Sequence, residues 1–135
     1  MAVETDSITL TAVLPAAPER VYRSWLDSAE HTAMTGGTAV IDPRVGGAHS
    51  AWDGYITGTT LGLEPGRRIV QAWRTANFPK KSADSRLEVL LEPDGDGTRL
   101  TIVHTSIPKG QGKRYKSGWP DNYFDPMRAY FSAAG

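Results

Sequence analysis

The sequence predicts an α+β fold in which an antiparallel sheet of about seven strands has one face covered by a C-terminal helix. Three observations lead to this prediction. Apolar residues alternate with threonines near the N-terminus, as in a strand with one face turned to a core. Two short helical segments follow, and strand-like runs separated by turn residues then fill about seventy residues. Helical periodicity returns only at the end, so the predicted order is one strand, two helices, six strands and one helix.

The N-terminal part is predicted to form one strand and two helices. The strand covers residues 8–14, where the alternation is regular. A helix is predicted from about Pro18 to Asp27, because proline is well tolerated in the first turn of a helix. A second short helix is predicted over residues 29–34. It ends at Gly36-Gly37, a pair that permits positive φ.

Six strands are predicted in the middle of the chain, each bounded by turn residues. They cover residues 38–41, 48–52, 55–63, 68–75, 85–92 and 99–107. In the fifth of these strands, Leu87 and Val89 alternate with charged Arg86 and Glu88. This pattern is typical of an antiparallel sheet that buries one face and exposes the other.

The last helix is predicted from large apolar and aromatic residues that recur every three or four positions: Trp119, Tyr123, Met127 and Tyr130. Pro120 and Pro126 interrupt the pattern, because an interior proline removes a backbone hydrogen bond. We therefore expect a helix that begins near Pro120, or a kinked helix. The basic segment before it, residues 109–116, is interpreted as a mobile loop or as the frayed start of that helix.

Length and composition narrow the class of protein. The chain has 135 residues, which predicts one domain over residues 1–135. Cysteine is absent, which excludes thiolate zinc sites and disulfide scaffolds and favours the cytoplasm. Fifteen basic residues balance fifteen acidic ones, so no net charge attracts nucleic acid or an anionic membrane. Neither a leader nor an apolar run of about 18 residues is apparent. We expect a soluble, unprocessed monomer or weak dimer.

Motifs for catalysis and metal binding are absent from the sequence. It contains no G-x-S-x-G elbow, no H-E-x-x-H and no phosphate-binding loop, so no catalytic residue, cofactor or metal is predicted. His31, His49 and His104 are too widely spaced to indicate a metal site, although folding could unite the last two with Asp53.

Polar residues on strands give the first candidates for a binding site. Alternation within residues 69–74 places Gln71 and Trp73 on the face that meets the helix, and His104 is placed there by the same rule. His49 is also expected on the concave side. Each histidine is interpreted either as a proton shuttle or ligand contact, or as a packing residue. Gln71 is interpreted either as an amide that orients a ligand or as a polar group at a wet rim.

Aromatic residues give the remaining candidates, because binding pockets for flat apolar molecules are mostly aromatic and aliphatic. The alternative interpretation is that these residues form an ordinary core. Tyr130 is a further aromatic residue of the same set. The predicted ligand-binding residues are Trp25, His49, Gln71, Trp73, His104, Trp119, Tyr123 and Met127.

Several short segments, taken with the element order, resemble a known family. The segments are Gly46-Gly47-Ala48-His49-Ser50, Asp53-Gly54-Tyr55-Ile56-Thr57-Gly58, Leu63-Glu64-Pro65, Arg68-Ile69-Val70-Gln71-Ala72-Trp73-Arg74 and Gly118-Trp119. Over residues 8–131 the chain resembles the C-terminal domain of the activator of heat-shock protein 90 ATPase (AHSA-type), within the START-like, Bet v 1-like SRPBCC superfamily. The resemblance implies a helix-grip fold, in which a curved sheet encloses a long C-terminal helix around a cavity.

Members of that superfamily use the cavity to hold apolar ligands or to carry out cyclisation or hydrolysis, or they fill it. We therefore expect a small cytoplasmic domain that binds an apolar or aromatic small molecule. One alternative is a chaperone-interacting module that uses the sheet surface and residues 109–116. A second is an enzyme like the family's cyclases or hydrolases, with His49 or His104 as general acid or base.

Overall fold

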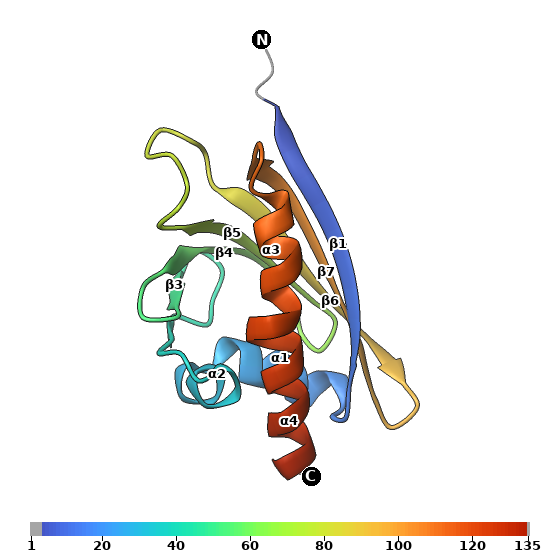
Figure 1. The fold of residues 1–135 in the computed structure, drawn as a ribbon. Helices are drawn as coiled ribbons and strands as arrows, with labels where there is room; N and C mark the ends of the chain where they lie inside the picture. The colour runs from blue at the N-terminus through green and yellow to red at the C-terminus, as the bar shows by residue number, and fades with distance from the viewer. Residues whose placement is uncertain (1–3, 135) are drawn as a thin grey trace.

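The structure is a computed structural model that describes residues 4–134. Residues 1–3 and Gly135 lie outside the described residues. The expectation that the chain has no leader concerns residues 1–3 and is therefore not tested by the structure. The described chain forms one seven-stranded antiparallel sheet with helices across one face (Figure 1). The predicted α+β class and element order are confirmed.

The helices and strands have the following bounds. The strands are β1 (Thr5–Leu14), β2 (Val40–Ile41), β3 (Ala48–Ala51), β4 (Ile56–Glu64), β5 (Arg68–Thr75), β6 (Ser85–Asp94) and β7 (Gly97–Pro108). The helices are α1 (Pro18–Leu26), α2 (Ser28–Thr35), α3 (Gly112–Trp119), the π-helical turn η1 (Pro120–Phe124) and α4 (Asp125–Ala134).

The sheet has the order β1-β7-β6-β5-β4-β3-β2, so the first strand forms one edge beside the last. Register shifts between Thr60 and Gly62 in β4 and between Asp6 and Ile8 in β1 mark irregularities in the ladder. Such bulges increase the local twist and bend a strand. The resulting sheet curves around the long C-terminal helix, which crosses in front of it (Figure 1).

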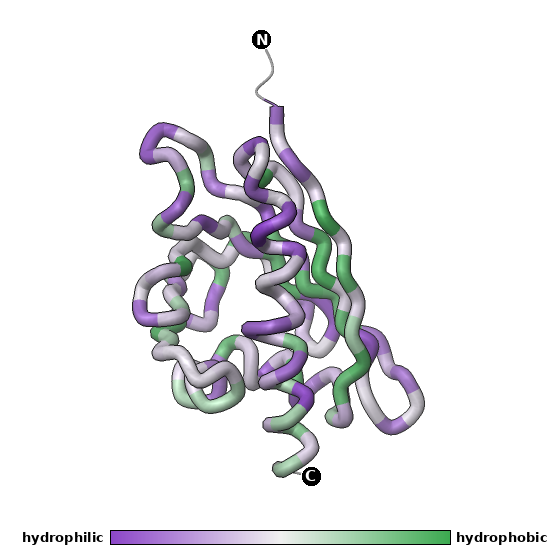
Figure 2. The backbone as a smooth tube through the Cα atoms, in the orientation of Figure 1, coloured by the Kyte–Doolittle hydropathy of each residue, from purple (hydrophilic) through white to green (hydrophobic). Residues whose placement is uncertain are grey.

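The core lies between the concave face of the sheet and this helix. Ile69 and Trp73 of β5 and Leu100 of β7 are buried on that face, as the alternation predicted. Figure 2 shows the hydrophobic stretches on the strands behind the helix. Within residues 4–134, none of the helices combines the length and the apolar character needed to cross a membrane.

The C-terminal helix begins at Gly112. Of the two interpretations of residues 109–116, the start of the helix is therefore correct and the loop is wrong for residues 112–116, and the alternative start near Pro120 is also wrong. Its first turn is capped from a distant strand, because the Asp6 carboxylate accepts hydrogen bonds of 2.9 Å from the backbone N–H groups of Gly110 and Gly112. The Gly112 hydrogen bond is the main cause of a lowered pKa for Asp6.

The two prolines lie at either end of the wider turn η1: Pro120 is its first residue, and Pro126 follows it in α4. Pro120 keeps helical angles of φ −62° and ψ −45°, and its carbonyl accepts from the N–H of Asp125, five residues on. In an α-helix, four residues exceed one full turn by about 40° of rotation about the axis, so side chains four residues apart gradually leave one face of the helix. A π turn contains more residues per turn and offsets this drift. Both Trp119 and Met127 are therefore buried against the sheet.

Candidate functional site

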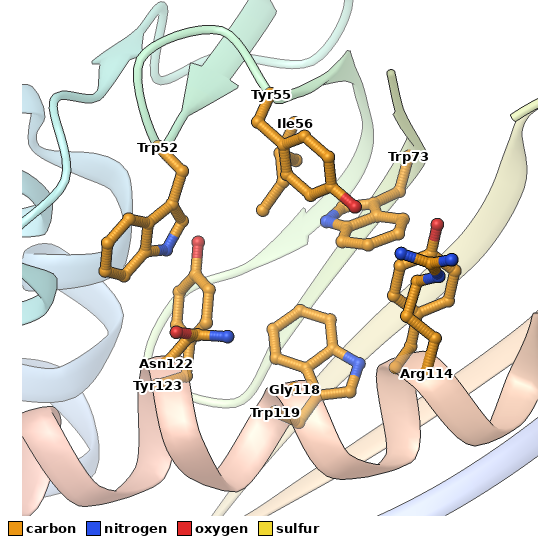
Figure 3. A pocket seen from close by; sticks show the side chains of 10 residues that line it. Trp52, Tyr55, Ile56, Trp73, Arg114, Gly118, Trp119, Asn122 and Tyr123 are labelled. Carbon is orange, nitrogen blue, oxygen red and sulfur yellow. The ribbon is translucent and has the colours of Figure 1, made fainter. Parts of the chain in front are cut away.

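A pocket of about 370 Å³ lies between the C-terminal helix and the β3–β5 side of the sheet (Figure 3). Six of its ten lining residues are aromatic. The sheet side contributes Trp52, Tyr55, Ile56 and Trp73, and the helix contributes Arg114, Tyr115, Gly118, Trp119, Asn122 and Tyr123.

The helix side of the pocket consists of two neighbouring stripes. Arg114, Gly118 and Asn122 are four residues apart and so lie along one face, next to the stripe that carries Trp119 and Tyr123. Gly118 leaves the space between its two neighbours unfilled. A Cβ at Gly118 would meet only the Asn122 Nδ2 atom, at 3.7 Å, so the backbone has room for a side chain there.

Trp52 forms the opposite wall from a turn between β3 and β4. Trp52 and Asp53 adopt positive φ angles of 51° and 59°, which are uncommon for residues with a side chain. The turn is held by a 3.0 Å hydrogen bond from the Asp53 N–H to the Thr38 carbonyl. The indole also lies against Gly37, where a Cβ would come within 2.6 Å of the Trp52 Cδ2 atom. Strained turns of this kind persist where the surrounding structure fixes them, often at binding sites.

Trp73 and Trp119 form the floor, with ring centroids 5.6 Å apart. Tyr115 packs edge-on to Trp73 at 5.1 Å, and Tyr123 packs on Trp119 at 4.9 Å. Tilted and edge-to-face pairs at these distances are favourable for aromatic rings. The floor is therefore a fixed aromatic surface.

His104 lies behind this floor and is fully buried. The Trp119 indole N–H donates to its Nδ1 atom (3.3 Å), so we assign the ring proton to Nε2, which donates to the Ser85 hydroxyl (2.8 Å). Ser85 in turn donates to the Trp73 carbonyl (2.7 Å). Burial lowers the pKa of His104 to about 3, so the ring is neutral and both its nitrogens are engaged.

His31 and Tyr123 form a second buried pair beside the pocket. The His31 Nδ1 atom donates to the Trp25 carbonyl (2.8 Å), which leaves Nε2 to accept from the Tyr123 hydroxyl (2.9 Å). Burial lowers the pKa of His31 to about 4 and raises the pKa of Tyr123. The pair is therefore uncharged near neutral pH and fixes the tyrosine ring in the pocket wall.

His49 and Gln71 are also buried and hydrogen-bonded within the sheet. The His49 Nε2 atom donates to the Ala72 carbonyl (2.9 Å), and burial lowers the pKa of this histidine. Gln71 accepts from the Trp25 indole N–H (3.4 Å) and donates to the Thr60 hydroxyl (3.2 Å). Gln71 is 3% exposed, which places it in the interior rather than at a wet rim.

The structure thus divides the predicted site residues into three groups. Trp73, Trp119 and Tyr123 line the pocket. Trp25, His49 and Gln71 line an adjoining cavity of only about 10 Å³, which Trp73 and Tyr123 also reach. His104 and Met127 line neither space.

Sequence reasoning did not propose the remaining pocket residues, which are Trp52, Tyr55, Ile56, Arg114, Tyr115, Gly118 and Asn122. Two signals were available: aromatic residues flank the Asp53-Gly54 turn, and the 114, 118, 122 stripe has helical spacing. The second signal was weak because residues 109–116 fitted a loop as well as the start of the helix. Among residues 4–134, no three His, Asp or Glu side chains form a group that could hold a metal ion.

The chain matches a known family over most of its length. The family model described as Activator of Hsp90 ATPase homolog 1-like protein matches residues 15–132. The activator of 90 kDa heat shock protein ATPase homolog from Dictyostelium discoideum is 29% identical over 129 residues, which are 95% of this chain and 33% of that protein. The chain spans 33–38% of the length of these curated relatives.

Two solved structures have the same fold. An HSP90 activator from Plasmodium falciparum superposes with a TM-score of 0.85 at 24% identity, over 93% of this chain and 96% of that one. CalU16 from Micromonospora echinospora superposes with a TM-score of 0.80 at 26% identity, over 96% of this chain and 78% of that one. At its level of identity, the first likeness shows the fold alone.

Proposed function

The chain belongs to the Activator of Hsp90 ATPase homolog 1-like family, and from this premise we propose that it binds a small aromatic molecule between the sheet and the C-terminal helix. The observation that carries the proposal is the pocket of about 370 Å³ with six aromatic residues in its lining. Small-molecule sites are concave, mostly apolar and supplied with a few polar groups, within a range of about 300–1,000 Å³. This pocket has that size and character.

The surroundings of the pocket support binding rather than catalysis. Its lining, all of it within the described residues, contains no carboxylate, histidine or thiol. His104 has both ring nitrogens engaged and is separated from the pocket by the Trp73 and Trp119 rings. A general acid or base must reach the proton that it transfers. The alternative that His49 or His104 performs this role gains no support from their positions.

The test fills the pocket from the helix while leaving its aromatic walls intact. Gly118→Leu places a side chain in the space between Arg114 and Asn122, and the helix gains up to about 1 kcal/mol from losing a glycine. Ser117→Leu is the matched control, because Ser117 is exposed on the same turn and does not line the pocket. Both variants and the wild type are screened by thermal shift against a panel of aromatic and lipid-like compounds.

A compound present at about 100 times its Kd stabilises the protein by about 2.7 kcal/mol, which raises Tm by about 10 °C for a domain of this size. We expect such compounds to raise the Tm of the wild type and of the Ser117→Leu variant, and to leave the Tm of the Gly118→Leu variant unchanged. Equal shifts in all three proteins would place binding elsewhere. A panel that shifts none of them would count against the proposal.

A second candidate function is contact with a chaperone. Its support is that a relative is named an activator of a heat shock protein ATPase, together with the exposed cations Lys113, Arg114 and Lys116 at the start of α3. The test is the ATPase rate of a purified 90 kDa heat shock protein with this chain added. Stimulation that a Lys113→Glu, Lys116→Glu double variant loses would favour this function, and an unchanged rate would exclude it for this chain alone.

A further inference from the structure

We propose that the molecule bound in this pocket is an aromatic anion whose acidic group pairs with Arg114 at the mouth of the pocket. This inference rests on the proposed function and adds the charge and the orientation of the ligand. It follows from three observations: the charge of the lining, the difference in charge between the two ends of the pocket, and the distance between those ends.

Arg114 is the one charged residue among the ten that line the pocket. Seven of the ten arginines of the chain form ion pairs with carboxylates, but Arg114 has no ion pair and no side-chain hydrogen bond to any residue in 4–134. A guanidinium beside an aromatic pocket and without a partner in the protein is available to a ligand. Its planar fork matches a carboxylate, sulfonate or phosphate oxygen pair.

The two ends of the pocket differ in charge. Lys113 and Lys116 are exposed next to Arg114 at one end. At the other end, two exposed carboxylates stand next to lining residues in the sequence. Asp53 follows Trp52, and Asp121 precedes Asn122. An anionic group is therefore attracted to the Arg114 end and repelled from the opposite end.

The distance between the ends sets the size of the ligand. Arg114 and Asn122 are two helical turns apart, about 12 Å along the axis. Figure 3 shows Trp119 and Gly118 between them, with Trp52 at the Asn122 end and Arg114 at the other. A molecule of two or three rings spans this length, so its rings lie over Trp119 while its acidic group reaches Arg114.

The experiment compares two fluorescent probes that differ in one charge. Anilinonaphthalene sulfonate and phenylnaphthylamine share the same ring skeleton, and only the first carries a sulfonate. Kd is measured by fluorescence titration for the wild type, Arg114→Gln, Lys113→Gln and Gly118→Leu. Lys113→Gln removes a neighbouring exposed cation that does not line the pocket, and Gly118→Leu fills the pocket.

We expect the wild type to bind the sulfonate about tenfold more tightly than the neutral probe, because a hydrogen bond to a charged group contributes about this factor. Arg114→Gln should raise the Kd of the sulfonate probe about tenfold and that of the neutral probe less than threefold. Lys113→Gln should change neither Kd by more than threefold, and Gly118→Leu should abolish the binding of both probes.

Two results would overturn the inference and leave the proposed function standing. The first is that the wild type binds both probes with equal affinity and Gly118→Leu binds neither. The second is that Lys113→Gln loses as much sulfonate binding as Arg114→Gln does. Binding of both probes that is unaffected by Gly118→Leu would instead contradict the proposed function itself.

Discussion

Buried histidines beside the pocket are held neutral, and this links the stability of the protein to pH. The pKa of His31 is lowered to about 4 and that of His104 to about 3, chiefly by burial, whereas in the unfolded chain both titrate near 6.5. Between these values the unfolded state binds protons that the folded state does not. The free energy of unfolding therefore falls as pH is lowered below about 6.5, and the loss continues until the folded-state pKa is reached.

We predict that lowering the pH from about 7 to about 5 costs about 2 kcal/mol of stability for each of these histidines. Urea denaturation of wild type and His31→Gln at both pH values measures this, and the variant should lose about 2 kcal/mol less than the wild type over the interval. NMR titration gives a second readout that does not depend on the variant. A His31 ring resonance that titrates with a midpoint near 6.5 in the folded protein would contradict the prediction.

At the scale of elements, the strands were predictable because their signal is local. The expected strand over residues 68–75 has the same bounds as β5, since alternation and flanking turn residues both lie within the segment. β2 is shorter than expected, Val40–Ile41 rather than residues 38–41. The Thr38 carbonyl is instead used by the Asp53 N–H to hold the Trp52 turn, a contact that no local pattern reveals.

The C-terminal helix was only partly predictable, because what starts it is distant in the sequence. Its N-terminal cap is the Asp6 side chain, which β1 brings to Gly110 and Gly112. Without this contact residues 109–116 fit a loop as well as the start of a helix, so Arg114 is not recognised as a pocket residue. The alternation in β5 predicted the inward direction of Trp73, whereas the pocket it faces depends on how two separate layers meet.

The segment after α2 makes a further prediction, because its two glycines serve different purposes. Gly36 has φ +89° and open space around it, so Gly36→Ala strains the backbone at a cost of about 1 kcal/mol and leaves the pocket unchanged. Gly37→Ala places a Cβ against the Trp52 indole and must move that ring. We expect both variants to lower Tm, but only Gly37→Ala to weaken probe binding, by about tenfold or more. Equal affinities of the two variants would show that Trp52 does not form a wall of the binding site.

At the scale of the whole molecule, residues 4–134 form a second concave region besides the aromatic pocket, and it too could receive a ligand. The first is the aromatic pocket between the helix and the β3–β5 side of the sheet. The second, of about 510 Å³, lies near the end of α4 and includes Asp94, Asp96 and Arg128 in its lining. Its charged lining suits an aromatic molecule poorly, since such sites are mostly apolar. The two regions are built from different parts of the chain, so their use can be distinguished.

Hydrogen exchange measured by mass spectrometry makes that distinction. A molecule in the aromatic pocket contacts both the Trp52 turn and the C-terminal helix, and it must leave before these walls can separate. With anilinonaphthalene sulfonate at about 100 times its Kd, we expect exchange in residues 51–56 and 112–124 to slow by up to about 100-fold. Residues 93–98, which form the tip of the β6–β7 hairpin beside the second region, should be unaffected. Protection of that hairpin with no change at the Trp52 turn would assign binding to the second region, because only a ligand that bridges sheet and helix couples the two walls of the first.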